Sequence, residues 1–240
     1  MAVIVEAAES APFEAPRPIS AVLFDVHSTL LDQGSADEWL DAALTRSPHD
    51  LDAVHRERLV AFLDRVWEGA RVRDPFSTRD LTAADHYRVF HELLEHAPSV
   101  DRELGDALYE GILDTWHAYA DTVPVLAELR SMGVAVGLLS NVGVSTHELL
   151  EREGLLDLAD AVTLSYEVGV VKPDPAIFQH CLDALGVSAL DALMVGDSGH
   201  DDAGGTALGM RTLILPRTRG SVHGLAVIPG LVRASREALG

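Results

Sequence analysis

Several residue types are scarce in this chain, and each scarcity excludes a class of protein. Cys181 is the single cysteine, so an internal disulfide is excluded and we expect a reducing, cytoplasmic compartment. Basic residues number 18 against 38 acidic ones, which gives a formal net charge of −20 at pH 7. Nucleic acids and anionic membranes are bound through basic patches, so this charge argues against both as partners. No apolar run has the length of a membrane span.

Lysine is the rarest cation of all. Lys172 is the only lysine, and arginine supplies every other basic side chain. A compact ammonium acts as a point charge on phosphate, which a planar guanidinium does not reproduce. The glycine and prolines between Val168 and Pro175 predict a loop around Lys172, with a helix beginning at about Asp174 or Pro175. Lys172 is therefore either a ligand for an anion or a lysine retained by chance.

The most informative stretch that is present runs from Ala21 to Leu31. A short apolar run ends in Asp25, and small polar residues follow at once. Such a run predicts a buried parallel strand, and ligands of open α/β sheets bind just outside the carboxyl ends of the strands. A carboxylate at that place can act as a nucleophile, a base or a metal ligand. The alternative is an aspartate that only caps a turn or a helix.

The chain divides into three regions. Residues 1–18, rich in alanine, glutamate and proline, predict a loose arm without the basic start of a signal peptide. Residues 35–120 have apolar side chains at helical spacing and predict a helical insert. Residues 19–34 and 121–240 alternate short helices with apolar strands, which predicts an α/β core around a parallel sheet. We expect strands at Val134–Leu139, Ala161–Leu164, Ala192–Val195 and Arg211–Leu215, and a loop at His223–Pro229 before a last helix at Leu231–Leu239.

Polar side chains follow several of the predicted strands. Asp25 follows the first, Ser140 and Asn141 a second, and Asp197 a later one, while Lys172 lies in the loop after another. Two carboxylates can share a Mg²⁺ ion, and a hydroxyl and an ammonium can bind phosphoryl oxygens. Phosphoryl transfer needs mainly such positioning and charge neutralisation, with Asp25 available to attack phosphorus. The pattern therefore favours a phosphoryl-transfer site.

These segments resemble the four motifs of the haloacid dehalogenase superfamily, in its phosphatase-like branch with a helical cap. The resemblance extends from Val22 to Leu215, and it implies a Rossmann-like doubly wound sheet with the cap inserted after the first motif. It also implies Mg²⁺ as cofactor and an aspartyl-phosphate on Asp25. The matching segments are Phe24–Leu30, Leu139–Asn141, Gly169–Pro175, and Val195–Ser198 with Asp201.

Two positions depart from the family pattern. His27 stands where the phosphatases usually have an aspartate that protonates the leaving group and then activates water. His27 is either a working acid and base, or a residue that slows hydrolysis of the intermediate, or the mark of a member that no longer catalyses. Its backbone carbonyl is expected to bind the metal in each case. Ser28 stands where glycine is usual, so the loop is expected to be reshaped.

The resemblance also assigns the remaining site residues. The metal ligands are Asp25, His27, Asp197 and one of the adjacent acids Asp201 and Asp202, since both could serve. Counting back from Gly209–Met210 favours Asp201, which leaves Asp202 as a solvated residue at a helix start. Substrate contacts are assigned to Thr29 and Asn141 in the motifs. Arg71 and Arg73 of the cap are candidates for a second anionic group, together with Arg79, although a solvated, ion-paired surface is the competing interpretation.

The expected function is Mg²⁺-dependent hydrolysis of a small anionic phosphorylated metabolite by a monomer or homodimer. Metal-independent dehalogenation of a 2-haloacid is the first alternative, because that branch shares Asp25, Ser140, Asn141 and Lys172. It typically has an aromatic residue at the position of His27 and lacks the Gly–Asp pair of the fourth motif. A degenerate family member that only binds a ligand is the second alternative.

Overall fold

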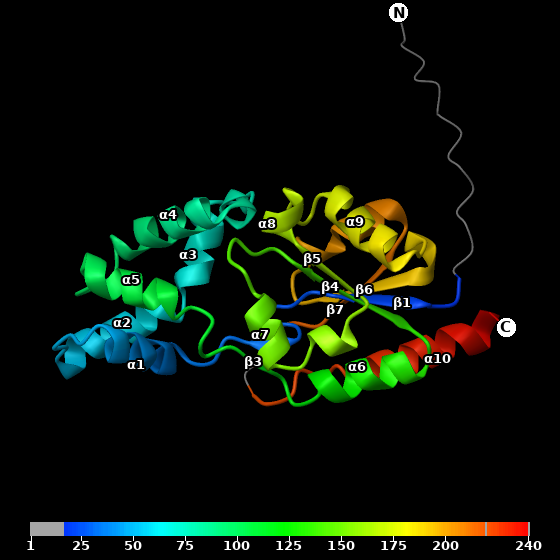
Figure 1. Ribbon diagram of the computed structural model, residues 1–240, viewed down its shortest axis with the longest axis horizontal. Helices are drawn as coiled ribbons and strands as arrows, with labels where there is room; N and C mark the ends of the chain where they lie inside the picture. The colour runs from blue at the N-terminus through cyan, green and yellow to red at the C-terminus, as the bar shows by residue number, and fades with distance from the viewer. Residues whose placement is uncertain (1–16, 219, 240) are drawn as a thin grey trace, which may run out of the picture.

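The computed structural model describes residues 17–218 and 220–239, so most of the arm expected at residues 1–18 lies outside it. A five-stranded, wholly parallel sheet forms the centre, in the order β5-β4-β1-β6-β7 (Figure 1). The strands are β1 (Ala21–Phe24), β4 (Ala135–Ser140), β5 (Ala161–Leu164), β6 (Ala192–Gly196) and β7 (Arg211–Ile214). This is the parallel α/β sheet that the strand and helix alternation predicts, with the Rossmann-like doubly wound arrangement that the family resemblance implies.

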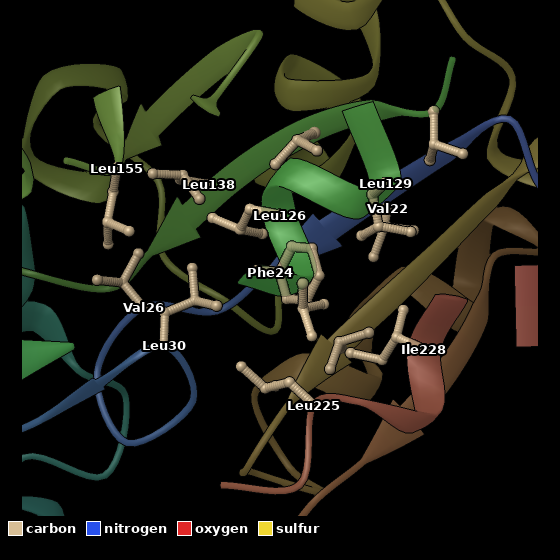
Figure 2. Packing of buried hydrophobic residues seen from close by; sticks show 14 of the residues in the cluster. Val22, Phe24, Val26, Leu30, Leu126, Leu129, Leu138, Leu155, Leu225 and Ile228 are labelled. Carbon is tan, nitrogen blue, oxygen red and sulfur yellow. The ribbon is translucent and has the colours of Figure 1, made fainter. Parts of the chain in front are cut away.

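Helices cover both faces of the sheet because its central strands are apolar on both sides. On one face α6 (Thr122–Ser131) and α10 (Val227–Leu239) pack against Val22 and Phe24 of β1 (Figure 2). On the other face α9 (Pro175–Leu185) packs against Leu23 and Leu139. The flanking set is completed by α7 (His147–Arg152), α8 (Ser165–Val168) and the 3₁₀ segments η2 (Leu156–Leu158), η3 (Ala189–Asp191) and η4 (Asp202–Leu208).

A group of helices between β1 and α6 forms its own core to one side of the sheet (Figure 1). Its cluster includes Trp39, Leu59, Phe90, Leu104 and Leu108, which come from several helices. Within each helix the buried apolar residues recur at helical spacing. Two chain crossings connect it to the sheet, and they pair as the short antiparallel strands β2 (Leu31–Asp32) and β3 (His117–Ala118). The helices are α1 (Ala36–Arg46), α2 (Ala53–Leu63), α3 (Val66–Arg73), η1 (Thr78–Leu81), α4 (Ala83–Leu94) and α5 (Arg102–Glu110), and we call this group the cap.

The start of the last helix differs from the expectation. The loop predicted over His223–Pro229 ends earlier, and α10 begins at Val227. Pro229 is compatible with the first helical turn, because backbone N–H groups there have no intrahelical acceptor and the N–H that proline lacks would form no helical hydrogen bond. Ile228 is fully buried in the cluster below the sheet, which gives this turn a packing partner. In the described ranges, no helix combines the length and the apolar content that crossing a bilayer requires.

Candidate active site

The site lies at the carboxyl edge of the sheet, where β1, β4 and β6 end. Asp25 follows β1, and its backbone N–H donates to the carbonyl of Val195 on β6 at 2.9 Å, so the two strand ends are held side by side. Ser140 is the last residue of β4 and is buried. Asp197 follows β6 directly. The parallel sheet thus brings three segments far apart in the sequence to one edge, as the strand-end pattern predicts.

Lys172 lies buried between two carboxylates. Its ammonium donates to Asp25 at 2.6 Å and to Asp202 at 2.7 Å, and it also contacts the carbonyl oxygen of Leu139 at 3.3 Å. Burial opposes the ammonium charge, but Asp202 and Asp25 outweigh it and raise the pKa of Lys172. The only lysine of the chain is therefore a fixed cation at the centre of the site and not a surface residue.

Asn141 holds the lysine loop in place. Its side-chain oxygen accepts from the backbone N–H of Lys172 at 2.7 Å, and its amide nitrogen donates to the carbonyl of Lys172 at 2.9 Å. The predicted helix start is also found, since Asp174 caps α9 and Pro175 is its first residue. Because both polar atoms of its amide are bonded to the backbone of Lys172, Asn141 positions that residue in this structure. Its assignment as a substrate contact stays a prediction.

Thr29 has a comparable role beside the expected nucleophile. Its hydroxyl donates to the carboxylate of Asp25 at 2.9 Å, and the residue has no solvent-exposed surface. The other carboxylate oxygen of Asp25 accepts from Lys172. Thr29 therefore orients Asp25 from behind, and its assignment as a substrate contact also stays a prediction.

Three carboxylates converge on one point. One oxygen each from Asp25, Asp197 and Asp202 lies within 4.8 Å of the others. Burial raises the pKa of Asp25 to about 7, with the carboxylates of Asp202 and Asp197 adding to the shift and Lys172 opposing it. Burial and Asp202 likewise raise the pKa of Asp197. Three carboxylates beside one ammonium leave a net charge of about −2 when all are ionised, which a divalent cation would neutralise. The donor set is of the hard oxygen type that Mg²⁺ prefers.

The choice between the two adjacent acids of the fourth motif is corrected by the structure. Asp202 is fully buried, bonds to Lys172 and accepts from the backbone N–H of Ser198 at 2.9 Å. Asp201 is on the outer side, where it accepts from Ser198 Oγ at 3.0 Å and contacts His200 at 2.8 Å. The interpretation of Asp202 as a solvated residue is therefore wrong.

The glycine before Asp197 makes room for this carboxylate. A Cβ atom at Gly196 would lie 2.0 Å from an oxygen of Asp202, a distance that no neighbouring side chain tolerates. Only a glycine at the end of β6 lets the buried carboxylate reach Lys172 from that side. The Gly–Asp pair of the motif thus supplies the carboxylate of Asp197 and also leaves room for the carboxylate of Asp202.

His27 is held by two contacts outside the carboxylate cluster. Its Nε2 lies 3.1 Å from the side-chain oxygen of Gln33, and its ring stacks on Trp116 with a centroid distance of 4.3 Å. Burial lowers the pKa of His27 to about 4, although the hydrogen bond to Gln33 opposes the shift. Ser28 next to it adopts a left-handed backbone with φ of 68°, a conformation typical of glycine. Ser28 therefore adopts the backbone conformation that a glycine would adopt here, and the expected reshaping of the loop is not found.

A cavity of about 70 Å³ lies between the carboxyl edge of the sheet and the cap. The core contributes His27, Ser140 and Asn141 to its polar end. The cap contributes Arg79, Asp80 and His86, all of them buried. Burial raises the pKa of Asp80 to about 6, and burial with the charge of Arg79 lowers the pKa of His86 to about 4. Apolar side chains complete the wall: Trp67, Ile112, Leu113, Trp116, Val142 and Val144.

The cap arginines are placed differently from the expectation. Arg73 is exposed and pairs with Glu92 at 2.9 Å on the cap surface, so its assignment to the substrate is wrong. Arg71 is also exposed, but its charge acts on Asp197 and His27, which places it near the mouth of the site. Arg79 is the arginine that lines the cavity. The sequence pattern identified the right cluster of arginines but could not select among them.

Comparisons with known proteins agree with this geometry. The family described as haloacid dehalogenase-like hydrolase matches residues 19–209. A phosphatase of Mycobacterium tuberculosis, MT3486, is 31% identical over 209 residues, covering 83% of this chain and 88% of that protein. (S)-2-haloacid dehalogenase 1 of a Pseudomonas species is 29% identical over 210 residues, covering 83% and 86%. The crystal structure of a phosphatase from Thermococcus onnurineus superimposes with a TM-score of 0.58 at 26% identity, covering 89% and 98%.

Proposed function

Since the chain belongs to the haloacid dehalogenase-like hydrolases, we propose that it is a Mg²⁺-dependent phosphatase that forms an aspartyl-phosphate on Asp25. The observation that carries the proposal is the cluster of Asp25, Asp197 and Asp202 around Lys172. Carbon–halogen displacement by a carboxylate needs one attacking aspartate and no metal. Lys172 offsets one of the three carboxylate charges, and the net charge of about −2 that remains would repel the attacking group unless a further cation is bound there.

The residues present fit such a cation. Asp25, Asp197 and Asp202 would hold it, with the backbone carbonyl of His27 proposed as a further ligand. Bound Mg²⁺ would neutralise the carboxylates and stabilise the charge on the transferring phosphoryl group. It would also relieve the repulsion that raises the pKa of Asp25, which keeps that carboxylate ionised at neutral pH.

The protein groups then divide the reaction into two steps. The Asp25 carboxylate attacks phosphorus, and the P–O bond to the alcohol breaks, so that the phosphoryl group is carried by Asp25. Lys172 and the hydroxyl of Ser140 bind the phosphoryl oxygens, since both lie at the same sheet edge as Asp25. Water then attacks phosphorus, releasing phosphate and the free carboxylate. Thr29 keeps Asp25 in one orientation throughout.

His27 is the group proposed to move the protons. It would donate to the leaving alcohol in the first step and accept from the attacking water in the second. Both roles suit an imidazole that lines the cavity and is fixed by Gln33 and Trp116. In the free protein the low pKa of His27 leaves its imidazole neutral, which is the form that accepts a proton from water. Donation to the leaving alcohol requires the protonated ring, which the negative charge of a bound phosphate ester would favour by raising the pKa of His27.

Dehalogenation of a small 2-haloacid remains the second candidate. The mainly aromatic and aliphatic wall of the cavity, with Trp67 and Trp116, suits an alkyl halide as well as it suits an alcohol. The similarity to a haloacid dehalogenase over 83% of this chain supports the same candidate. Activity without metal would be its distinguishing property.

A substrate panel separates the candidates. Purified protein would be assayed with phosphate monoesters and 2-haloacids, each with Mg²⁺ and with a chelator. We expect phosphate release that disappears with chelator, returns with Mg²⁺ and is absent in Asp197→Asn, with no halide release. Metal-independent halide release would replace the proposal by the dehalogenase function. Absence of both activities would contradict both catalytic candidates.

A further inference from the structure

Two buried cations occur among the described residues, and the proposed reaction uses only one of them. Lys172 contacts the nucleophile Asp25, whereas Arg79 of η1 lines the cavity to which the core contributes Ser140 and His27. Arg79 is 9% exposed, although arginine is otherwise the surface cation of this chain. Long charged side chains are rarely buried without a partner or a ligand. The contacts of Arg79 therefore indicate what it is placed there to bind.

The peptide backbone around Arg79 is fixed by Asp74. The carboxylate of Asp74 accepts from the backbone N–H of Arg79 at 2.7 Å and from the hydroxyl of Thr78 at 2.9 Å. These bonds lower the pKa of Asp74 against the opposing effect of burial. The carboxylate of Asp74 is thus bonded to a backbone N–H and a hydroxyl, and these bonds close the turn before Arg79. The guanidinium is presented to the cavity by a rigid turn.

The guanidinium itself keeps donors for a ligand. Its Nη1 donates to the carbonyl of Asp74 at 3.2 Å. The carboxylate oxygens of Asp74 and Asp80 lie 3.5 and 3.3 Å from its nitrogens, whereas charge-assisted hydrogen bonds are about 2.7–2.9 Å long. These carboxylates balance the charge of Arg79 without binding it in the two-pronged geometry that a carboxylate can offer.

The cap is seated tightly on the core next to Arg79. A Cβ atom at Gly143, in the loop after β4, would lie 2.6 Å from the carbonyl oxygen of Arg79. Ser165 of α8 donates its hydroxyl proton to the carbonyl of Asp80 at 2.6 Å. These two observations place the backbone carbonyls of Arg79 and Asp80 directly against the core. The distance between Arg79 and the catalytic edge is thus set by packing and not by a free loop.

The space between them limits the size of the leaving group. The cavity of about 70 Å³ is roughly half the volume of an engineered protein cavity that holds benzene. A leaving group of only a few heavy atoms fits there. Trp67 and Trp116 on its wall exclude water, which strengthens an ion pair formed inside.

Resting on the proposed phosphatase function, we propose that Arg79 is a specificity-determining residue that binds a carboxylate on the leaving group. The substrate class is then the phosphate ester of a two- or three-carbon hydroxy acid. One end of such a molecule is the phosphoryl group at Asp25 and Lys172, and the other end is the carboxylate at Arg79. A guanidinium matches a carboxylate with two parallel N–H donors.

Three probes of similar size test this assignment in the full-length protein with Mg²⁺. They are 2-phosphoglycolate, ethyl phosphate and O-phosphoethanolamine, whose leaving groups end in a carboxylate, a methyl and an ammonium. We expect kcat/KM for 2-phosphoglycolate to exceed that for ethyl phosphate by about tenfold to a hundredfold, the range of one charge-assisted hydrogen bond. O-phosphoethanolamine is expected to be the poorest of the three.

Variants assign that preference to Arg79. Arg79→Met with Asp80→Asn removes the charges of Arg79 and Asp80 together, while Asp74 keeps its hydrogen bonds from the backbone N–H of residue 79 and the hydroxyl of Thr78. Arg79→Lys keeps the charge without the two-pronged geometry. We expect the double variant to lose the preference for 2-phosphoglycolate while it keeps turnover of ethyl phosphate, and Arg79→Lys to keep part of the preference. Arg73→Met, on the exposed pair with Glu92, is the control and is expected to behave as wild type. Thermal melting confirms folding of each variant.

The outcomes separate this inference from the function on which it rests. Equal turnover of 2-phosphoglycolate and ethyl phosphate by the wild type would overturn the role of Arg79 but leave the phosphatase proposal standing. A preference for O-phosphoethanolamine would assign recognition to the carboxylate of Asp80 instead. A double variant that keeps the wild-type preference would also overturn it. Failure of the wild type to hydrolyse any phosphate monoester with Mg²⁺ would overturn both proposals.

Discussion

Replacing Asp25 by asparagine is expected to make the protein more stable at alkaline pH, because the buried carboxylate cluster is repulsive in the absence of metal. Burial and the neighbouring carboxylates raise the pKa of Asp25 from 3.8 to about 7. The folded protein therefore binds this proton more tightly than the unfolded chain does. The stabilising contribution is complete below pH 3.8 and is lost as pH rises through about 7. Asn at this position is neutral at every pH and loses nothing.

The size of the effect follows from the shift. A raised pKa of about 3 units corresponds to about 4 kcal/mol of folding free energy between the two pKa values. Between pH 5 and pH 8 the part that is lost is about 3 kcal/mol. For a chain of this length that is a difference of roughly 6–12 °C in melting temperature. The stability of Asp25→Asn relative to wild type should therefore grow from pH 5 to about pH 7 and then level off.

The comparison of two proteins is essential, because other groups titrate in the same range. Burial lowers the pKa of His27 and of His86 to about 4, so each of them raises stability as pH increases toward 6.5. Burial raises the pKa of Asp80 to about 6, which has the opposite sign. The difference between wild-type and variant curves cancels these contributions. The assay is thermal or urea unfolding from pH 5 to pH 8 with chelator present.

Mg²⁺ should reduce the effect. At ten times its dissociation constant the ion would add about 1.4 kcal/mol to the stability of the wild type at pH 8, and less to that of Asp25→Asn. Asp183→Asn on α9 is the control, since this exposed aspartate lies outside the cluster. A stability difference between wild type and Asp25→Asn that is the same at pH 5 and pH 8 would refute the reasoning. So would equal stabilisation of both proteins by Mg²⁺.

Three further predictions concern activity. Asp202→Asn should reduce phosphatase kcat/KM by at least about 100-fold and weaken Mg²⁺ activation, whereas Asp201→Asn should stay within about threefold of wild type; equal losses would contradict the placement of the two acids. Lys172→Arg should lose most activity despite its retained charge, because a guanidinium does not fit the buried position between two carboxylates. Wild-type turnover by folded Lys172→Arg would contradict this requirement for an ammonium. His27→Asp should keep or raise turnover, while His27→Ala should slow phosphate release and accumulate a phosphoryl adduct on Asp25 in mass spectra; pH–rate profiles of His27→Ala identical to those of wild type would exclude an acid–base role.

The sequence predicts this site well where the backbone alone decides the outcome. Parallel strands end at one edge of a sheet, so Asp25, Ser140 and Asp197 could be placed together from strand ends. The isolated lysine could be linked to them because no other lysine competes for the role. The sheet itself follows from short apolar runs alternating with helices.

Side-chain direction was harder to predict. Asp201 and Asp202 are adjacent, and the 3₁₀ segment that begins at Asp202 turns one inward and the other outward. Counting residues along the chain does not give this rotation. Thr29 and Asn141 were assigned to the right region, but whether a polar group faces the substrate or a neighbouring residue depends on hydrogen bonds between distant segments.

The cap was the least predictable part of the site. Arg71, Arg73 and Arg79 lie within nine positions, and the residue type alone does not distinguish them. Only the close packing of η1 against the loop after β4 decides that Arg79 is the buried one. The sequence offered one signal, because Asp74 and Asp80 lie on either side of Arg79 in the chain and both carboxylates lie beside its guanidinium in the structure. That signal cannot be separated from a surface pair without the fold.

The fate of solvent oxygen in one turnover tests most directly whether water attacks phosphorus, as the proposed phosphatase requires, or the carboxyl carbon of Asp25, as a dehalogenase requires. The wild-type protein, in molar excess over the phosphate monoester it hydrolyses best, would react with Mg²⁺ in water labelled with heavy oxygen. If Asp25 carries a phosphoryl group and water attacks phosphorus, the label enters the released phosphate and the peptide containing Asp25 stays unlabelled. Heavy oxygen in the Asp25 carboxylate after a 2-haloacid turnover without metal would contradict the account, because water attacks the carboxyl carbon when Asp25 carries an alkyl ester.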